Sequence, residues 1–215
     1  MADNLTERLE SCYTGAVFDV MWDLGFPNGL LPRELKSLDP EKTVAGPVFP
    51  VLGRPDSSLT PDESLLRWTE FLGTVPAGHV DACQPQDDDR APMGELSAET
   101  LQFRVCGATS WTAAAAMFRS SRHSAFPSSA ASPPLVTLWW RGLRKPTTSP
   151  SRLVRSIHPG DYILGDQDGI VILPGTQAEA IVNRVEVVVQ TENLVRKAIL
   201  EGMPPKEAYL QYRKF

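Results

Sequence analysis

The sequence predicts one mixed α/β domain over residues 1–215. Two patterns near the C-terminus, a hairpin and a long helix, support this prediction together with the composition. Residues 162–166 and 170–174 are short apolar runs on either side of a turn at 167–169, which is typical of a β-hairpin. A chain of this length that is 42% hydrophobic can also bury a core. The segment after the hairpin predicts a long amphipathic helix, because apolar residues recur at helical spacing at Ala178, Ile181, Val185, Val188, Val195 and Ile199.

Local signals place the other elements along the chain. We expect the strand at 43–51 to be an edge or bulged strand, because Gly46 and Pro47 interrupt it. Glu95 and Glu99 lie near the positive N-terminal end of an expected helix, which favours carboxylates. In order, the expected elements are a helix capped by Thr14 and closed by Gly25, a turn at 26–29, a strand at 43–51, a helix at 62–71, a strand at 78–83, a helix from Gly94 through Leu101 and a turn at 158–161.

Charge and cysteine usage exclude several classes of protein. The net charge of −5 argues against a nucleic-acid-binding surface, because phosphate binding needs a basic one. No apolar run approaches the roughly twenty residues of a membrane span, and the acidic N-terminus is unlike a signal peptide. Three widely spaced cysteines indicate reduced thiols and a cytoplasmic protein rather than a disulfide framework. The three histidines are equally scattered, so their spacing does not indicate a zinc site.

One internal segment differs from the rest of the chain in charge. Residues 105–156, here called the acid-free segment, contain none of the 26 acidic residues but seven Arg and Lys residues. The segment includes Trp111, Trp139 and Trp140, and its runs of Ser, Pro and Ala follow neither the helical nor the strand period. We therefore expect residues 107–156 to be disordered or misfolded, while the segments on either side fold as one domain.

Glu192 interrupts the apolar stripe of the expected C-terminal helix. The stripe runs four residues from Val188 to Glu192 and three more to Val195. A carboxylate on an apolar face must be paired, lie exposed at an end, or point into a site on a neighbouring subunit. A solvated carboxylate at the edge of the stripe explains the sequence equally well.

Four motifs outside the acid-free segment resemble those of the RraA-like proteins, which include the 4-hydroxy-4-methyl-2-oxoglutarate aldolases. The resemblance covers about residues 11–104 and 158–215. It implies the swivelling β/β/α domain of that family, assembled as a homotrimer or as a hexamer. The motifs are Val44-Ala45-Gly46-Pro47-Val48-Phe49, Met93-Gly94-Glu95-Leu96-Ser97, Pro159-Gly160-Asp161-Tyr162-Ile163-Leu164-Gly165-Asp166-Gln167-Asp168-Gly169-Ile170-Val171, and Thr191-Glu192-Asn193 with Arg196.

The resemblance also implies a motif of the form Asp-Gly-x-x-Arg-Asp, which the chain lacks. A displaced reading frame supplies it when the last base of each codon is joined to the first two bases of the next. The codons of Trp111 and Thr112 then give Asp, and the four junctions from Thr112 to Ala116 permit Gly, Gly, Cys and Arg. The junction of Ala116 with Met117 permits the second Asp.

The displaced frame agrees with the family beyond this motif. Before the first Asp it permits Gly-Val-Arg-Gly-Tyr-Val-Val, a buried strand, and near residues 144–153 it permits acidic residues again. We infer a one-base deletion near Arg104 and a compensating shift near Ser156. The alternative is a natural insert rich in Ser and Ala.

For function, the resemblance implies metal-dependent cleavage of 4-hydroxy-2-oxo acids to pyruvate, or decarboxylation of oxaloacetate. A divalent cation, Mg²⁺ or Mn²⁺, stabilises the pyruvate enolate, and the motif Asp holds it while the motif Arg pairs with the substrate carboxylate. Gly94 and the backbone amides of Leu96 and Ser97 would bind the pyruvyl end. Glu95 would hold a metal-bound water, and Glu192 of an adjacent subunit would reach the same water cluster.

The chain as it stands has Ala116 and Met117 where the Arg and Asp of that motif would lie. Neither side chain binds a carboxylate or a cation, so we expect this chain to hold no metal and to be inactive as a lyase. The alternative is a non-catalytic regulator, because some RraA proteins bind ribonuclease E and need no Arg-Asp pair.

Several of these carboxylates have simpler interpretations. Glu95 can be only a carboxylate at a helix start, and Asp166 and Asp168 are best explained as turn residues. The run at 87–89, three consecutive Asp residues, is best explained as an exposed acidic turn.

Overall fold

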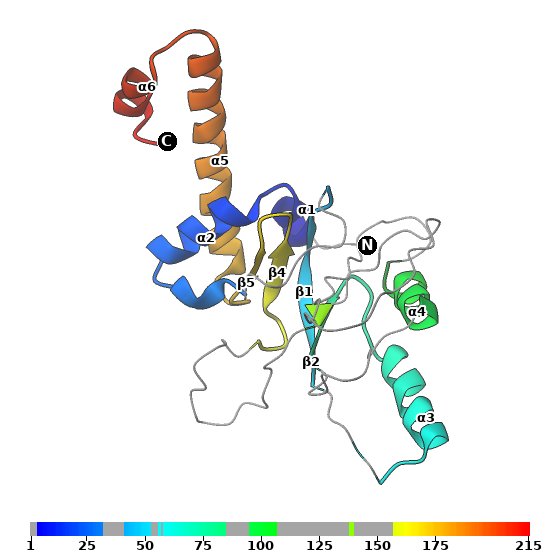
Figure 1. The fold of residues 1–215 in the computed structure, drawn as a ribbon. Helices are drawn as coiled ribbons and strands as arrows, with labels where there is room; N and C mark the ends of the chain where they lie inside the picture. The colour runs from blue at the N-terminus through cyan, green and yellow to red at the C-terminus, as the bar shows by residue number, and fades with distance from the viewer. Residues whose placement is uncertain are drawn as a thin grey trace, which may run out of the picture.

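The computed structural model describes residues 4–31, 41–52, 56, 58–84, 95–106, 138–139 and 157–215. Five strands form one sheet in the order β3-β2-β1-β4-β5, with helices packed around it (Figure 1). The mixed α/β class predicted from the sequence is therefore confirmed. The elements are α1 (Asn4–Glu10), α2 (Thr14–Asp23), η1 (Pro27–Gly29), β1 (Val44–Leu52), α3 (Pro61–Leu72), β2 (Val80–Gln84), α4 (Glu95–Cys106), β3 (Leu138–Trp139), β4 (Tyr162–Gly165), β5 (Ile170–Leu173), α5 (Ala178–Leu200) and α6 (Pro205–Tyr212).

Strand β1 changes its partner halfway along its length. Residues 44–47 pair antiparallel with β4, whereas residues 48–52 pair parallel with β2. Strand β1 is the middle strand of the sheet, but each half of it pairs on one side only, so the expected edge position holds for each half and not for the strand as a whole. Pro47 and Pro50 are tolerated because no N–H donor is needed on the unpaired side.

The sheet separates two clusters of buried side chains, in agreement with the alternation of residues along a strand. One cluster, here called the second core, consists of Leu31, Val44, Val48, Val80, Ala82, Ile157, Ile163, Ile170 and Ile172. The other cluster, here called the first core, joins α1, α2 and α5 to the sheet. None of its members among the described residues lies between residues 46 and 163. These members are Leu9, Cys12, Ala16, Val17, Val20, Met21, Ala45, Leu164, Val171, Leu173, Ala178, Ile181, Val182 and Val185.

Helix α2 begins against the hairpin between β4 and β5. The backbone N–H and the hydroxyl of Thr14 donate to the buried Asp166 carboxylate at 2.8 and 2.7 Å. Thr14 is the first residue of the helix and not its cap, which is Tyr13, because a distant carboxylate replaces the local capping group. The same carboxylate accepts hydrogen bonds from the N–H groups of Asp168 and Gly169 in the turn.

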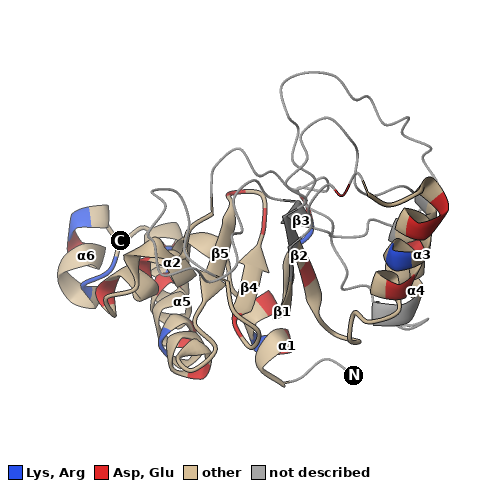
Figure 2. Ribbon diagram, turned by 90° about the horizontal axis from the view of Figure 1, so that it is seen from below, with Lys and Arg blue, Asp and Glu red and all other residues tan. Residues whose placement is uncertain are grey.

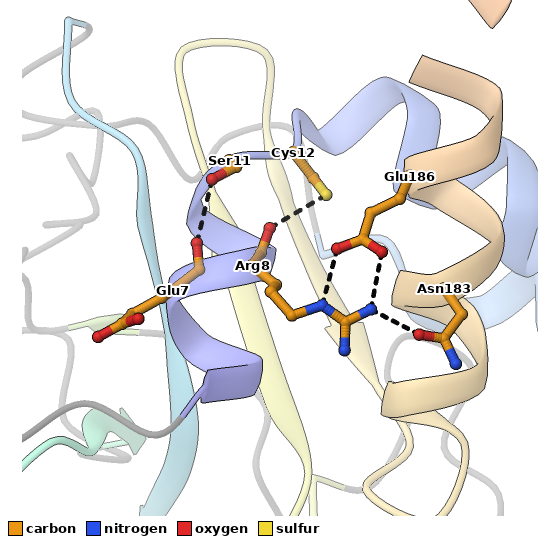
Figure 3. Close-up of polar contacts among 6 residues, drawn as sticks. All are labelled: Glu7, Arg8, Ser11, Cys12, Asn183 and Glu186. Carbon is orange, nitrogen blue, oxygen red and sulfur yellow. Dashed lines mark hydrogen bonds and ion pairs between the residues drawn. The ribbon is translucent and has the colours of Figure 1, made fainter. Parts of the chain in front are cut away.

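Helix α1, which the sequence did not predict, is held against α5 by one arginine (Figure 3). The Arg8 guanidinium donates two hydrogen bonds to the Glu186 carboxylate, at 2.7 and 2.8 Å, and one to Asn183 Oδ1 at 2.5 Å. This forked contact fits the planar guanidinium and lowers the pKa of Glu186 through the hydrogen bond from Arg8.

The acid-free segment is described at residues 105–106 and 138–139. The first pair ends α4, and the second forms β3, parallel to β2, with Leu138 opposite Ala82 and Trp139 opposite Cys83. The expected disorder or misfolding of the other residues in 107–156 lies outside the described residues, as do Trp111 and Trp140.

Two pairs of helices lie at opposite ends of the molecule. Helices α3 and α4 contact each other beside β2, while α6 packs on the C-terminal part of α5 beyond the other end of the sheet (Figure 1). The view turned by 90° shows the same separation (Figure 2). In the described part of the chain, no helix has the length and apolar character to cross a membrane.

Candidate functional site

The N-terminus of α4 holds the first group of candidate residues. The helix begins at Glu95, so the backbone N–H groups of Leu96 and Ser97 lie in its first turn. N–H groups there have no intrahelical acceptor, and together with the helix dipole they favour a bound carboxylate. Leu96 is 77% exposed, so the start of α4 lies at the surface at this residue. Gly94 and the side chain of Glu95 lie outside the described residues.

A tryptophan of the neighbouring helix fixes Ser97. Trp68 on α3 donates from its ring nitrogen to Ser97 Oγ at 2.8 Å, and its ring lies 5.1 Å from that of Phe71. Helix α3 itself starts at a capping box, in which Thr60 and Glu63 exchange hydrogen bonds. The start of α4 is thereby held by an ordered helix.

Glu192 on α5 is paired, the first of the three options open to a carboxylate in an apolar stripe. Its side chain is 18% exposed. The Tyr13 hydroxyl donates to Glu192 Oε2 at 2.5 Å, and Lys214 Nζ lies 3.3 Å from Glu192 Oε1. The three residues, here called the Glu192 cluster, come from the start of α2, the middle of α5 and the C-terminal tail.

The environment of Tyr13 keeps its proton in place. Burial of the hydroxyl, the hydrogen bond to Glu192 and the negative charge of Glu192 raise the pKa of Tyr13 to about 12. The hydroxyl therefore remains a donor at neutral pH, although 40% of the residue is exposed. A short O–H···O⁻ contact of this kind is stronger than a hydrogen bond between neutral groups.

Within one chain, the two groups of candidate residues are not brought together. Leu96 and Ser97 lie on α4 and Glu192 lies on α5, and these two helices lie at opposite ends of the molecule in both views (Figures 1 and 2). Ala116, Met117 and the acidic run at 87–89 lie outside the described residues. Among the residues that the structure places, no three His, Cys, Asp or Glu side chains are grouped as metal ligands.

Sequence reasoning missed three residues that contact the candidate positions. Tyr13 and Lys214 reach Glu192 from 179 and 22 residues away, and Trp68 reaches Ser97 from 29 residues away. No local pattern could reveal these contacts, since each depends on how distant elements pack.

One further carboxylate is buried without a partner. Asp81 on β2 is 4% exposed, and neither of its oxygens has a hydrogen-bond partner among the described residues. Burial raises the pKa of Asp81 to about 7. The sequence analysis did not single out Asp81 as a candidate residue.

Comparison with solved structures shows which known fold this chain resembles. No protein-family model matches the chain, and neither does any curated protein. Among solved structures, an uncharacterized protein from Pseudomonas syringae pv. tomato str. DC3000 matches with a TM-score of 0.66 and 19% identity, over 99% of this chain and 95% of that chain. A structure described as belonging to novel cellulases from microbes associated with the gut ecosystem matches with a TM-score of 0.59 and 22% identity, over 88% of this chain and 85% of that chain.

A third structure carries a family name. RraAS2 of Streptomyces coelicolor, described as an unusual member of the RNase ES inhibitor RraA protein family, matches with a TM-score of 0.60 and 18% identity. The match covers 92% of this chain and 99% of that chain. At such identities the likeness concerns the fold alone. This chain has the RraA-like fold.

Proposed function

We propose that this chain derives from a metal-dependent lyase of 2-oxo acids and has lost that activity. The ancestral reaction is cleavage of 4-hydroxy-4-methyl-2-oxoglutarate-type acids to pyruvate, or decarboxylation of oxaloacetate. The observation that carries this proposal is the position of the Gly-Glu-Leu-Ser motif within an RraA-like fold. Its Leu96 and Ser97 amides lie in the first turn of α4, where they can bind the carboxylate of a 2-oxo acid.

The loss of activity follows from the chemistry of the two motif positions. Breaking the C–C bond leaves an electron pair on the enolate of pyruvate, and that charge must be stabilised as it develops. A divalent cation supplies this stabilisation when one is bound. The side chains of Ala116 and Met117 offer it no oxygen, and the described residues contain no group of three His, Cys, Asp or Glu side chains that could hold it. The two motif positions and the described residues therefore do not fit the cation.

A displaced reading frame over the acid-free segment accounts for the loss. It restores an Asp-Gly-x-x-Arg-Asp motif at residues 111–117 from the codons of the present residues. We define the frame-restored chain as the protein in which residues 105–156 are encoded in that frame.

We further propose that the working site forms between subunits of a homotrimer or hexamer. Glu192 lies on α5, and α5 and α4 lie at opposite ends of the molecule, so Glu192 would reach the first turn of α4 in another chain (Figures 1 and 2). The end that carries α5 and α6 exposes apolar side chains, including Leu194, Leu200 and Leu210. Burial of these side chains against a second chain would remove apolar surface from water, which favours the proposed assembly.

The test compares the chain as it stands with the frame-restored chain. Oxaloacetate consumption is followed with Mg²⁺ and with EDTA, and the frame-restored chain with its motif Asp replaced by Ala is the matched control. We expect Mg²⁺-dependent turnover from the frame-restored chain alone. Turnover by the present chain at a similar rate would contradict the proposed loss, and inactivity of both would contradict the lyase.

A second candidate function is that of a non-catalytic regulator of a ribonuclease. The likeness to RraAS2, which is described as a member of an RNase ES inhibitor family, favours it. Such a role needs no Arg or Asp in the acid-free segment. Inhibition of ribonuclease E by the present chain, at a similar level to that by the frame-restored chain, would support this function, and equal lack of inhibition by both would remove it.

A further inference from the structure

We infer that Tyr13 and Lys214 are positioning residues, which hold the Glu192 carboxylate in a fixed orientation and leave part of it free to accept from a neighbouring subunit. The inference rests on the proposed function, in which Glu192 serves the site of an adjacent chain. It adds two residues that no motif indicated.

The contacts fix both oxygens of the carboxylate. Tyr13 donates to Oε2 at 2.5 Å and Lys214 lies 3.3 Å from Oε1, so rotation of the group would break one contact or the other. A carboxylate can accept about four hydrogen bonds, and these two partners leave room for water or a ligand. With a side chain that is 18% exposed, Glu192 remains in reach of solvent.

The chain path brings Lys214 to this place. Gly202, with φ of 102°, follows α5 and lets α6 turn back beside it. Arg213 caps α6 in the left-handed conformation with φ of 55°, which is unfavourable for a residue with a side chain by about 1 kcal/mol. The tail keeps this unfavourable turn, and the turn directs Lys214 onto Glu192.

A neighbouring cation has a different partner. Arg196 lies one helical turn beyond Glu192, close enough to lower the pKa of Tyr13, but its guanidinium donates to Asn193 Oδ1 at 2.5 Å. Lys214 is therefore the cation that contacts Glu192 directly among the described residues.

The first part of the test uses the present chain and tyrosine ionisation. Tyrosine labelled with ¹³C at the ring carbon next to oxygen is titrated by NMR, and the Tyr13 signal is assigned by its loss in Tyr13→Phe. We expect Tyr13 to ionise near pH 12 and its midpoint to fall in Glu192→Gln, which removes the charge of Glu192 and its hydrogen bond but leaves the burial of Tyr13 in place. Glu201→Gln changes the carboxylate at the C-terminal end of α5, which pairs with Lys197, and should leave the midpoint unchanged. An unchanged midpoint in Glu192→Gln would overturn the contact.

The second part uses kinetics of the frame-restored chain. Tyr13→Phe and Lys214→Met should each lower kcat about tenfold with little change in KM, the size typical of losing a group that orients another. Lys214→Arg should retain most of the rate, because it keeps the cation. Sedimentation and circular dichroism confirm that each variant is assembled and folded.

The outcomes separate this inference from the function on which it rests. If the unmodified frame-restored chain is active but Tyr13→Phe and Lys214→Met match it in kcat, the positioning role is overturned and the lyase stands. If the unmodified frame-restored chain is inactive, the lyase and the positioning role both fall, and the NMR titration decides the contact by itself.

Discussion

The Asp166 carboxylate binds both the backbone N–H and the hydroxyl of Thr14, and so joins the β4–β5 hairpin to the start of α2. Because both contacts are buried and the acceptor is charged, we expect Asp166→Asn to lower the free energy of unfolding by about 2 kcal/mol. Urea denaturation measures the change. Asp168→Asn, at an exposed position in the same turn, is the control and should change stability by less than about 0.5 kcal/mol. Equal effects of the two variants would show that the Asp166 contact contributes little.

Asp81 should make the protein less stable as the pH rises. Its pKa is raised from 3.8 to about 7 in the folded protein, so folding favours the protonated form. This contribution to stability is fully present below about pH 4 and is lost as the pH rises through about 7, at up to about 1.4 kcal/mol per pH unit.

The measurement for Asp81 is a pair of stability curves from pH 4 to 8. Asp81→Val removes the titrating group, so its advantage over the unmodified chain should grow as the pH rises. Glu10, whose pKa burial and nearby Glu7 raise to about 7, contributes with the same sign to both proteins, so the difference curve isolates Asp81. A difference that does not vary with pH would mean that Asp81 is charged throughout the range.

Trp68 should stabilise the start of α4 through its single ring donor. Trp68→Phe keeps an aromatic ring beside Phe71 but removes the hydrogen bond to Ser97, and we expect a loss of about 1 kcal/mol. Hydrogen exchange of the α4 amides, followed by mass spectrometry, should show faster opening of the first turn. Trp22→Phe, at a residue that is 60% exposed, is the matched control. Identical exchange of α4 in the two variants would refute this role.

Glu192 should affect turnover without affecting assembly. In the frame-restored chain we expect Glu192→Gln to lower kcat while the oligomer stays intact, because an amide neither attracts a metal-bound water nor accepts its proton. Steady-state kinetics and sedimentation give the two readings, and Glu201→Gln is the control. A rate unchanged by the substitution would return Glu192 to a purely structural role.

Local sequence patterns predicted the elements whose signals lie within a few residues. The hairpin and α5 occur where turn residues and apolar spacing placed them, and α3 occurs at the expected position. Helix α1 was missed because it has seven residues, too few for a periodic signal, and depends on the distant contact between Arg8 and Glu186. The place of β1 in the sheet was also missed, because strand neighbours are set by packing and not by the residues of the strand.

The candidate site was predictable only in part, for the same reason. The sequence singled out Ser97 and Glu192, yet their partners Trp68, Tyr13 and Lys214 come from other elements. A stripe of apolar residues shows that a carboxylate on it needs a partner, but the partner's identity depends on the tertiary structure.

The positions of the first-core residues in the sequence indicate how a frame change in the gene would affect folding. All of its buried members among the described residues come from residues 9–45 and 164–185, so a frame change confined to codons 105–156 substitutes none of these. The proposed Asp-Gly-x-x-Arg-Asp motif and the described members of the first core are thus encoded in separate stretches. Such a change can abolish catalytic activity while the N-terminal and C-terminal segments still pack together. We therefore expect an altered gene of this kind to yield a persistent protein rather than a rapidly degraded one.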